Sequence, residues 1–350
     1  MTNNLPVISI IIPHWNGIEI LSECIDSLQK TKFDSYEIIV SDNASTDGSQ
    51  QWLKENHNQV ILLENEKNYG YAGGCNRGAD IAKGDYLVFL NNDTIHDSIW
   101  LESLFDCIQS KDNIAAVQPK ILNYFDRSIF DYAGASGGFM DILCYPFARG
   151  RLFFNQERDE GQYDNASSCF WASGTALMVK KNLFYEAGKF DEIFFAHMEE
   201  IDLCWRLHIM GYEIWVEPRS KIFHKNAATL PIDSHFKFYL NHRNSLIMLF
   251  SNYSLANALY IGSLRLILEF IAMGYAIIKL DLSHLTGIVR SLVWIIFHPI
   301  SIFKKRRRFN ELRKIKDKII FKKLYKASII ISYFLKGKKT YSEIVSKAVL

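Results

Sequence analysis

The sequence predicts an α/β protein built around a mostly parallel sheet with helices on both faces. The first observation is that short apolar segments alternate with amphipathic stretches from residue 7 to residue 117, a pattern typical of repeated strand–helix units. The second is that these segments are apolar at successive positions. Strands have this composition when helices cover both faces of the sheet.

Five apolar segments mark the predicted strands, at residues 7–12, 36–42, 59–64, 85–93 and 114–119. The stretches between them show helical spacing of apolar residues, one through Leu21, Ile25 and Leu28, one after Ser45, and one through Ala79 and Ile81. Ligands of such sheets bind beyond the carboxyl ends of the strands. We therefore expect one shared rim for the segments that follow the strands, PHWN (13–16), SDNAST (41–46) and NND (91–93).

The middle of the chain is less regular. Residues 120–165 are rich in Gly, Asp and aromatic residues and are predicted to be irregular, with short strands. The α/β pattern resumes over 169–225. Within that range, EEIDLCWRLHIMG (199–211) is predicted to be a helix and YEIWVEP (212–218) a strand.

The end of the chain differs in hydrophobicity and charge. Residues 255–278 and 285–303 are strongly apolar. Residues 301–350 hold 16 Lys and Arg against 3 Asp and Glu, a balance of +13, whereas the preceding residues hold 24 against 35, a balance of −11. We therefore expect an α/β domain over 1–250 and a helical region with a basic tail over 251–350.

The composition excludes several classes of protein. With 49% hydrophobic and 22% charged residues over 350 positions, the chain is neither disordered nor fibrous. Its six cysteines are scattered, without C-x-x-C or metal-finger spacing, which predicts reduced thiols in a cytoplasmic protein. No basic region precedes the first apolar run, so no signal peptide is expected.

The NND segment is a candidate for cation binding. Asp93 places a carboxylate at the end of the fourth predicted strand, with Asn91 two residues earlier. Magnesium is typically held by one or two carboxylates plus phosphate oxygens of the substrate. A turn cap is the alternative, because Asn and Asp are common turn residues.

Two further segments suggest a nucleotide. Asp42 ends the second strand, where a carboxylate is placed to hydrogen-bond a base or a ribose. NYGYAGGCNRG (68–78) is a glycine-bearing loop that opens a helix and suits close backbone approach to a phosphate. It is not G-x-G-x-x-G, and PHWN rather than glycine follows the first strand. A dinucleotide-binding Rossmann site is therefore disfavoured.

An ordered set of motifs resembles glycosyltransferase family 2. The motifs are IIPHWNG, VSDNASTDGS, NYGYAGGCNRG, LNND, WASGTALMV, FDEIFFAHMEEIDLCWR and His224. The resemblance spans roughly residues 5–250 and fits best the members with the GT-A fold, a nucleotide-diphospho-sugar transferase fold, in the bacterial rhamnosyltransferase-like branch. It implies an inverting transfer of a sugar from a nucleotide diphosphate, with Mg²⁺ or Mn²⁺ as cofactor.

The resemblance also implies roles for individual residues. Those expected to bind the nucleotide and its diphosphate are Pro13, Trp15, Asn16, Asp42, Asn68, Gly70, Gly73, Asn76 and Asn92. Those expected to border the donor sugar and the acceptor are Trp171, Ser173, Gly174 and Arg243. The metal-binding D-x-D of the family falls on Asn91 and Asp93, with His224 completing the site, so that fewer charges would hold the metal.

The catalytic base is expected at the start of the 199–211 helix. Inversion by single displacement requires one group to take the proton of the acceptor hydroxyl as it attacks the anomeric carbon. The family usually has Glu-Asp here, whereas this sequence has Glu199 and Glu200. Glu200 therefore aligns with the base, and Glu199 is the second candidate. The helix dipole alone also favours glutamates at a helix N-terminus.

Other polar residues keep a second interpretation. His224 is as compatible with an ordinary histidine as with a metal ligand. Arg243, in YLNHRNS, suits a phosphate or pyrophosphate-lipid contact, and an ion pair within the protein suits it equally. Asp202 and Arg206 are spaced at i,i+4 and are expected to pair on the helix surface.

The apolar segments after residue 250 approach the length of membrane-spanning helices. However, Arg265 and Glu269 would be costly inside a bilayer, although a helix brings them together at i,i+4. We therefore favour helices that lie in the membrane plane or re-enter it, with the basic tail beyond Lys304 attracted to an anionic leaflet. The alternative is a hydrophobic helical subdomain packed on the first domain. Nothing else in the chain supports a nucleic-acid partner.

These observations together predict a glycosyltransferase at the cytoplasmic face of the inner membrane, peripheral or monotopic. It would move a sugar from dTDP-rhamnose or a UDP-hexose to a glycan or lipid-linked acceptor in cell-surface polysaccharide synthesis. A nucleotidyltransferase is one rival, but it has no need of the Glu199–Glu200 helix. The other rival is a catalytically silent, membrane-bound scaffold, which the departures at Asn91 and Glu200 leave open.

Overall fold

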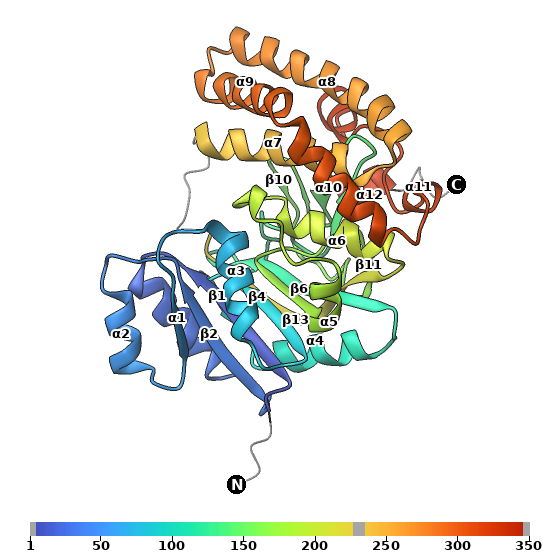
Figure 1. The fold of residues 1–350 in the computed structure, drawn as a ribbon. Coiled ribbons are helices and arrows are strands. Elements are labelled where there is room, and N and C mark those ends of the chain that lie inside the picture. Colours follow the sequence, from blue (N-terminus) through green and yellow to red (C-terminus); the bar gives the residue numbers. More distant parts are fainter. Residues whose placement is uncertain (1–4, 227–234, 346–350) are drawn as a thin grey trace.

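The computed structural model describes residues 5–226 and 235–345 (Figure 1). Its first part alternates strands and helices, as the sequence predicts. The elements are β1 (Ile8–His14), α1 (Ile18–Leu28), β2 (Tyr36–Asp42), α2 (Ser49–Asn56), β3 (Ile61–Glu64), α3 (Gly70–Ile81), β4 (Tyr86–Leu90), β5 (Thr94–His96), α4 (Trp100–Gln109) and β6 (Ile114–Asn123).

The middle of the chain holds short strands, as expected, and then returns to the main sheet. The short strands β7 (Gly138–Met140), β8 (Pro146–Ala148), β9 (Arg151–Leu152) and β10 (Asn155–Gln156) form a separate antiparallel sheet. The elements that follow are β11 (Ser167–Cys169), β12 (Ala176–Lys180), α5 (Lys181–Glu186), η1 (Glu192–Phe194), α6 (Glu199–Ile209) and β13 (Glu213–His224).

The main sheet is mixed, in the order β11-β13-β6-β12-β4-β1-β2-β3, with β5 paired to β13. Strands β4, β1, β2 and β3 run parallel to one another, whereas β12 runs antiparallel to both of its neighbours, β4 and β6. In the register of β1 and β2, His14 lies opposite Asp42. The ends of these two strands therefore meet at the predicted rim.

Two cores cover the two faces of this sheet. In β1, Ile8, Ile10 and Ile12 pack in one core together with residues of α1 and α4. Ile11 points the other way, into the core that contains Ala72 of α3 and residues of α5, α6 and α7. Because successive strand residues face opposite sides, the unbroken apolar run predicted this double burial.

The last part of the chain is helical. Figure 1 shows α7, α8 and α9 gathered together at the top of the molecule, above the main sheet. The elements are α7 (His235–Asn252), α8 (Leu255–Ile278), α9 (Leu282–Phe297), α10 (Pro299–Leu312), α11 (Asp317–Ile320), η2 (Ile331–Leu335) and α12 (Tyr341–Val345). The apolar segment 285–303 is not one helix, because α9 and α10 meet at a 73° bend next to Pro299, which suits a helix start and breaks a helix interior.

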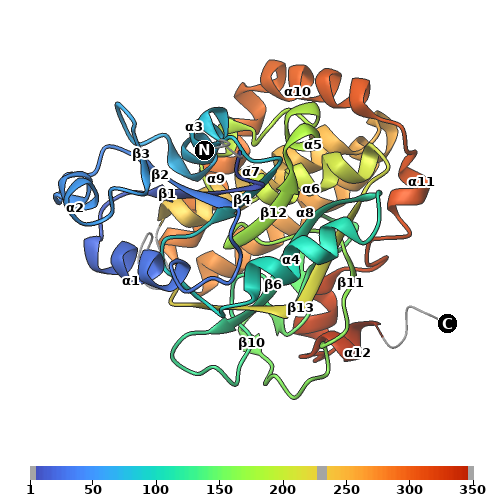
Figure 2. The same ribbon diagram turned by 90° about the horizontal axis from the view of Figure 1, so that it is seen from below.

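Two expectations about charged residues need correction. The basic tail does not begin as a free segment: Lys305 Nζ lies 2.8 Å from Asp191 Oδ2 and 3.1 Å from Asp202 Oδ2. Asp202 and Arg206 do pair, with 2.9 Å between Asp202 Oδ2 and Arg206 Nη2, but both are buried rather than on the helix surface. Lys305 on α10 thus reaches Asp202 on α6, a contact that helical spacing alone does not predict. Figure 2 shows α10 along the top edge of the molecule.

Candidate active site

The rim predicted from the strand ends is held together by a buried histidine. His14, at the end of β1, contacts Asn92 Nδ2 through its Nδ1 at 2.9 Å and Ser49 Oγ through its Nε2 at 3.0 Å. Burial lowers the pKa of His14, against the opposing charges of Asp42 and Asp47. A neutral imidazole thus joins β1, the turn after β4 and the start of α2.

Asp42 presents an open acceptor in this rim. Its side chain is fully buried, and its Oδ1 accepts hydrogen bonds from Ser45 N at 2.9 Å and Gln50 Nε2 at 2.6 Å. Its Oδ2 has no hydrogen-bond partner among the described residues. A buried acceptor without a partner is costly and needs an explanation, and an N–H or O–H of a bound ligand would supply one.

The segment after β1 shapes the edge of this pocket. Trp15 is 45% exposed, so its ring is accessible from solvent. Asn16 adopts a φ of 57°, and its Oδ1 accepts a hydrogen bond from Thr46 N at 2.8 Å. Pro13 is half-buried, and it lies so close to Gly74 that a Cβ there would be 3.2 Å from Pro13 Cβ.

The glycine-bearing start of α3 serves close packing. Asn68 Oδ1 accepts a hydrogen bond from Gly70 N at 2.8 Å, which fixes the turn into the helix. Gly70 has a φ of +71°, and a Cβ there would lie 2.4 Å from Phe195 O. At Gly73 a Cβ would lie 2.6 Å from Tyr69 Cβ. Gly70 therefore lets the loop before α6 approach the start of α3, and Gly73 leaves room for the side chain of Tyr69.

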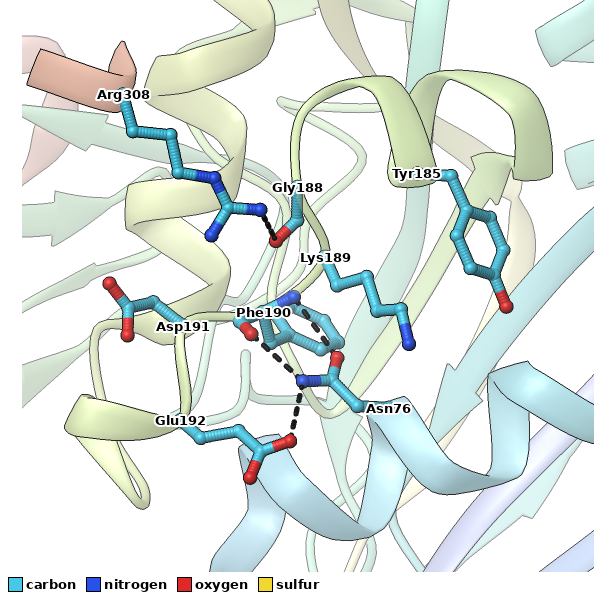
Figure 3. Close-up of a pocket in the computed structure, with 8 residues that line it drawn as sticks. All are labelled: Asn76, Tyr185, Gly188, Lys189, Phe190, Asp191, Glu192 and Arg308. Atoms are coloured by element: carbon cyan, nitrogen blue, oxygen red, sulfur yellow. Dashed lines mark hydrogen bonds between the residues drawn. The ribbon is translucent and has the colours of Figure 1, made fainter. Parts of the chain in front are cut away.

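Asn76 points away from the rim and into a shallow pocket of about 340 Å³ on the other side of α3 (Figure 3). Its Nδ2 donates to Phe190 O at 2.8 Å and to Glu192 Oε1 at 3.2 Å, and its Oδ1 accepts from Phe190 N at 3.1 Å. Arg308 of α10 closes the pocket by donating to Gly188 O at 3.2 Å. Asn76 therefore anchors the chain that leads into η1.

A histidine lies between two carboxylates at the ends of β4 and β13. His224 Nε2 is 3.1 Å from Asp93 Oδ1 and 3.5 Å from Asn91 Nδ2, and its Nδ1 is 2.9 Å from Asp131 Oδ1. Burial alone lowers the pKa of His224, but the charge of Asp93 and the hydrogen bond to Asp131 outweigh it and raise the pKa to about 10. All three groups are buried.

This group has the chemistry of a partial metal site. Metal-binding histidines usually donate their second N–H to a carboxylate, which is the place Asp131 takes. No cluster of three or more His, Cys, Asp or Glu side chains suited to a metal occurs in 5–226 and 235–345. The residues present therefore fit a cation that also takes ligands from a substrate, rather than one in a complete protein cage.

Glu199 and Glu200 open α6 after Met198, whose φ is 72°. Each has a buried Oε2 without a hydrogen-bond partner among the described residues. Burial and then the charge of Glu200 raise the pKa of Glu199 well above its usual range. Burial also raises the pKa of Glu200, but hydrogen bonds from backbone N–H groups, including that of Gly174, limit it to about 7.

Trp171, Ser173 and Gly174 precede β12 and are closely packed. Trp171 is 7% exposed; its Nε1 donates to Phe139 O at 2.7 Å and its ring covers Gly138. Ser173 is also buried, and its Oγ donates to Ala133 O at 2.9 Å. Of the three, Gly174 lies closest to the carboxylates, because its backbone N–H contacts Glu200.

Contacts in the structure link several of the predicted residues along the rim. His14 links Asp42 to Asn92, and Asn91 N donates to Thr175 O at 3.0 Å, next to the Gly174 contact with Glu200. Arg243 lies behind the loop before α6 rather than among these groups. Sequence analysis missed His14 and Asp131; His14 falls within PHWN, but Asp131 falls in a segment without periodicity.

Comparisons with known proteins agree with this arrangement. Residues 9–171 match the family described as Glycosyl transferase family 2. N-acetylglucosaminyl-diphospho-decaprenol L-rhamnosyltransferase of Mycobacterium tuberculosis is 25% identical over 272 residues, covering 73% of this chain and 86% of the relative. Glycosyltransferase GlyG of Streptococcus pneumoniae is 29% identical over 191 residues, covering 51% of this chain and 58% of the relative.

Solved structures share the fold. GalNAc-T7 with UDP, GalNAc and Mn²⁺ aligns with a TM-score of 0.57 at 17% identity, over 71% of this chain and 48% of the other. Mannosyltransferase PcManGT from Pyrobaculum calidifontis, in complex with GDP-Man and Mn²⁺, aligns with a TM-score of 0.50 at 13% identity, over 84% and 88%.

The chain therefore has the GT-A fold of nucleotide-sugar transferases, and residues 9–171 match glycosyltransferase family 2. It is a hexosyltransferase-class enzyme of glycan biosynthesis.

Proposed function

We propose that this enzyme transfers a sugar from a nucleotide diphosphate to an acceptor hydroxyl, with inversion at the anomeric carbon. The observation that carries the proposal is the chain of contacts around the strand ends. Asp42 lies opposite His14 in the register of β1 and β2, His14 contacts Asn92, and Asn91 is joined through Thr175 and Gly174 to Glu200. A nucleotide pocket, a diphosphate site and a base thus lie along one rim.

Each residue has a distinct task in the proposed reaction. The open Oδ2 of Asp42 accepts a hydrogen bond from the base or the ribose, and the exposed ring of Trp15 flanks the nucleotide, with Pro13, Asn16 and the segment from Asn68 to Gly73 shaping the pocket. Asp93, Asn91 and His224 would hold the cation, provided that His224 gives up its proton when the metal binds. When bound, Mg²⁺ or Mn²⁺ supplies charge stabilisation to the departing diphosphate.

Glu200 acts as the base of the displacement. Its ionised carboxylate takes the acceptor proton while the acceptor oxygen bonds to the anomeric carbon and the bond from that carbon to the diphosphate oxygen breaks. A pKa near 7 suits this task, because the group is then ionised in a useful fraction of molecules and still accepts a proton readily. Burial and the charge of Glu200 also raise the pKa of Glu199 well above its usual range.

The donor and acceptor are proposed from the relatives. A rhamnosyltransferase among them favours dTDP-rhamnose, with a UDP-hexose as the alternative. The name of that relative includes a diphospho-decaprenol, so we propose a lipid-linked or glycan acceptor in cell-surface polysaccharide synthesis. We propose that Trp171, Ser173 and Gly174 border the donor sugar and the acceptor, since the backbone N–H of Gly174 contacts Glu200.

We further propose that the enzyme acts at the cytoplasmic face of the inner membrane, on which α8 and α9 lie in the plane. Helix α8 has the length and hydropathy of a spanning helix, but only 28% of its most apolar window is buried. Its exposed side includes Tyr260, Ile267, Ile271 and Ile278, each more than half exposed. Such an apolar patch is unusual on a protein that meets only water.

The charges of α8 favour this in-plane arrangement over a span. Arg265 and Glu269 lie on the buried side, and Arg265 Nη1 donates to Leu143 O at 2.8 Å, which ties α8 to the rest of the enzyme. Exposed Lys279 follows the last residue of α8, and exposed Lys304 and Arg307 lie on α10, the helix after α9. Basic groups near an anionic leaflet each contribute roughly 1 kcal/mol.

Vesicle binding tests the membrane proposal. The enzyme is expected to sediment with vesicles of phosphatidylcholine and phosphatidylserine, and an Ile267→Asp, Ile271→Asp double variant is expected to stay in solution. Phe125→Asp, which changes an exposed aromatic residue in the loop after β6, is the control. Equal sedimentation of both variants with the unaltered enzyme would overturn the proposal.

Thermal unfolding with donor panels tests the transferase proposal. UDP-, dTDP- and GDP-sugars are added with Mn²⁺ or Mg²⁺, because a ligand raises Tm only if it prefers the folded state. We expect a metal-dependent rise with one nucleotide series and its loss in Asp93→Ala. A folded enzyme that responds to no donor would contradict the proposal.

A further inference from the structure

The loop that leads into the catalytic helix has an unusual backbone. Between η1 and α6, three non-glycine residues lie in the left-handed region: Phe195 at φ 64°, His197 at 66° and Met198 at 72°. Side chains with a Cβ adopt this region at a cost, and they persist there only where the surroundings enforce it. Glu199 and Glu200 follow directly, so this loop sets where their carboxylates lie.

Two neighbouring side chains of α7 hold the loop. Asn244 Nδ2 lies 3.0 Å from Phe194 O, 2.9 Å from Ala196 O and 2.7 Å from His197 O. Its two N–H groups are thus shared among three carbonyl oxygens. Asn244 is fully buried, so no water replaces these bonds if they are lost.

Arg243 holds the same loop, and Arg243 and Asn244 together are called the clamp below. Its Nη2 donates to Ile193 O at 2.7 Å and to Phe194 O at 3.2 Å. Its Nε donates to Asn244 Oδ1 at 2.9 Å, which orients the amide so that its N–H groups face the loop. Nη1 reaches Tyr239 OH at 3.3 Å. Because each nitrogen of the guanidinium has a partner inside the protein, the expected contact of Arg243 with a phosphate or sugar is replaced by a structural one.

The clamp is itself fixed by the other C-terminal helices. Ser291 of α9 donates from Oγ to Tyr239 O at 3.0 Å, and Arg265 of α8 donates from Nη2 to Ser245 Oγ at 2.8 Å. On the opposite side of the loop, Ala72 N of α3 donates to Phe195 O at 3.1 Å. The loop is therefore held by hydrogen bonds from α3 on one side and from α7 on the other.

We infer that Arg243 and Asn244 are positioning residues for the catalytic carboxylates, which they hold in place through the backbone of residues 193–198. This inference rests on the proposed role of Glu200 as the base. It assigns the C-terminal helices a part in catalysis besides membrane contact, because α8 and α9 support α7 and α7 supports the loop.

The test compares Asn244→Ala with Ser251→Ala. Ser251 lies on the same helix and is equally buried, but its Oγ has no hydrogen-bond partner among the described residues. Asn244→Asp, which keeps the shape but opposes the carbonyls with a carboxylate, is the second variant. The readouts are hydrogen exchange of the amides of 194–200 and release of nucleoside diphosphate from the donor panel, with water as acceptor, as a function of pH.

Both Asn244 variants are expected to speed exchange in 194–200 by about tenfold or more, because the bonds that hold the loop are lost. They are also expected to lower kcat by about tenfold or more with little change in the donor KM, and to shift the midpoint of the pH profile, because the environment of Glu200 changes. Ser251→Ala should leave all three readouts close to those of the unaltered enzyme, because it removes no hydrogen bond.

Two results would overturn the inference. Unchanged exchange in 194–200 would show that Asn244 does not hold the loop. Faster exchange with an unaltered kcat and pH profile would show that the clamp does not position the carboxylates. If the unaltered enzyme releases no nucleoside diphosphate from any donor, the proposed function fails instead, and the exchange data alone still decide whether the clamp holds the loop.

Discussion

Two of the regions of this enzyme that hold buried charges differ in their surroundings. At the rim, Asp42, Glu199 and Glu200 each keep a buried carboxylate oxygen without a partner among the described residues. On the buried side of α8, Glu269 accepts a hydrogen bond from Arg265 at 2.8 Å and pairs with His242 Nδ1 at 2.7 Å.

The contrast separates charges that support the fold from charges that await a ligand. A buried charge with a full set of partners has its hydrogen bonds made within the protein. Removing one partner lowers the stability of the fold strongly, because the other charge stays buried without compensation. A buried acceptor left open costs stability, and such costs persist at sites where a ligand supplies the missing bond. The predictions below test this division, beginning with the largest effect.

Glu200→Gln is expected to lower kcat by roughly 10²–10⁴-fold, the usual contribution of general base catalysis. Donor binding should persist, since the amide has the same shape. Sugar transfer or donor hydrolysis measures the first effect, and the donor-dependent rise in Tm measures the second. Glu199→Gln is the matched control, because it makes the same change at the neighbouring buried carboxyl, and its loss of kcat should be smaller if Glu200 is the base. The reverse ranking would make Glu199 the base.

Glu269→Ala is expected to lower the free energy of unfolding by about 3–5 kcal/mol, because Arg265 would remain buried without its carboxylate. Urea unfolding followed by circular dichroism measures the change. The double variant Arg265→Met, Glu269→Leu removes both charges and should recover most of the loss. A cost below about 1 kcal/mol for Glu269→Ala would mean that the pair is not structurally required.

Asp42→Asn is expected to weaken donor binding by about 1–3 kcal/mol, as for a lost hydrogen bond to a charged group. The stability of the unliganded enzyme should be unchanged or higher, because a buried charge with an open acceptor becomes neutral while Oδ1 keeps its partners. Calorimetric titration with the donor and thermal unfolding measure the two effects. Lower stability of the unliganded enzyme with an unaltered affinity for the donor would mean that Asp42 is one of the charges that support the fold.

The pH dependence of activity should follow Glu200. Its pKa in the folded enzyme is raised to about 7, so kcat/KM is expected to rise roughly tenfold per unit below that pH and to level off above it. The sign for stability is opposite: between its ordinary value near 4.5 and 7 the folded state holds the proton more tightly, so ionisation of this group lowers stability as pH rises. A pH profile that stays flat from 5 to 7 would contradict this assignment.

Much of the rim can be predicted from the sequence, because it depends only on where each strand ends. Parallel strands end at one edge of a sheet, so PHWN, SDNAST and NND were expected to lie together, and in the structure they do. The pairing of Arg265 with Glu269 was likewise expected from helical spacing, and it is confirmed at 2.8 Å. Both predictions use periodicities that an isolated segment already possesses.

What the tertiary structure decided lies in contacts between distant segments. Asn244 reaches carbonyls about fifty positions earlier, and Lys305 reaches Asp191 across 114 positions. Asn76 and Trp171 carry motif positions of the family, yet their side chains are bonded to the backbone of the protein itself. Backbone carbonyls as partners leave no trace in the sequence, because any residue can provide one. The amino-acid order thus determined the strands, the rim and the carboxylates of this enzyme, whereas only packing decided which polar side chains remain open to a substrate.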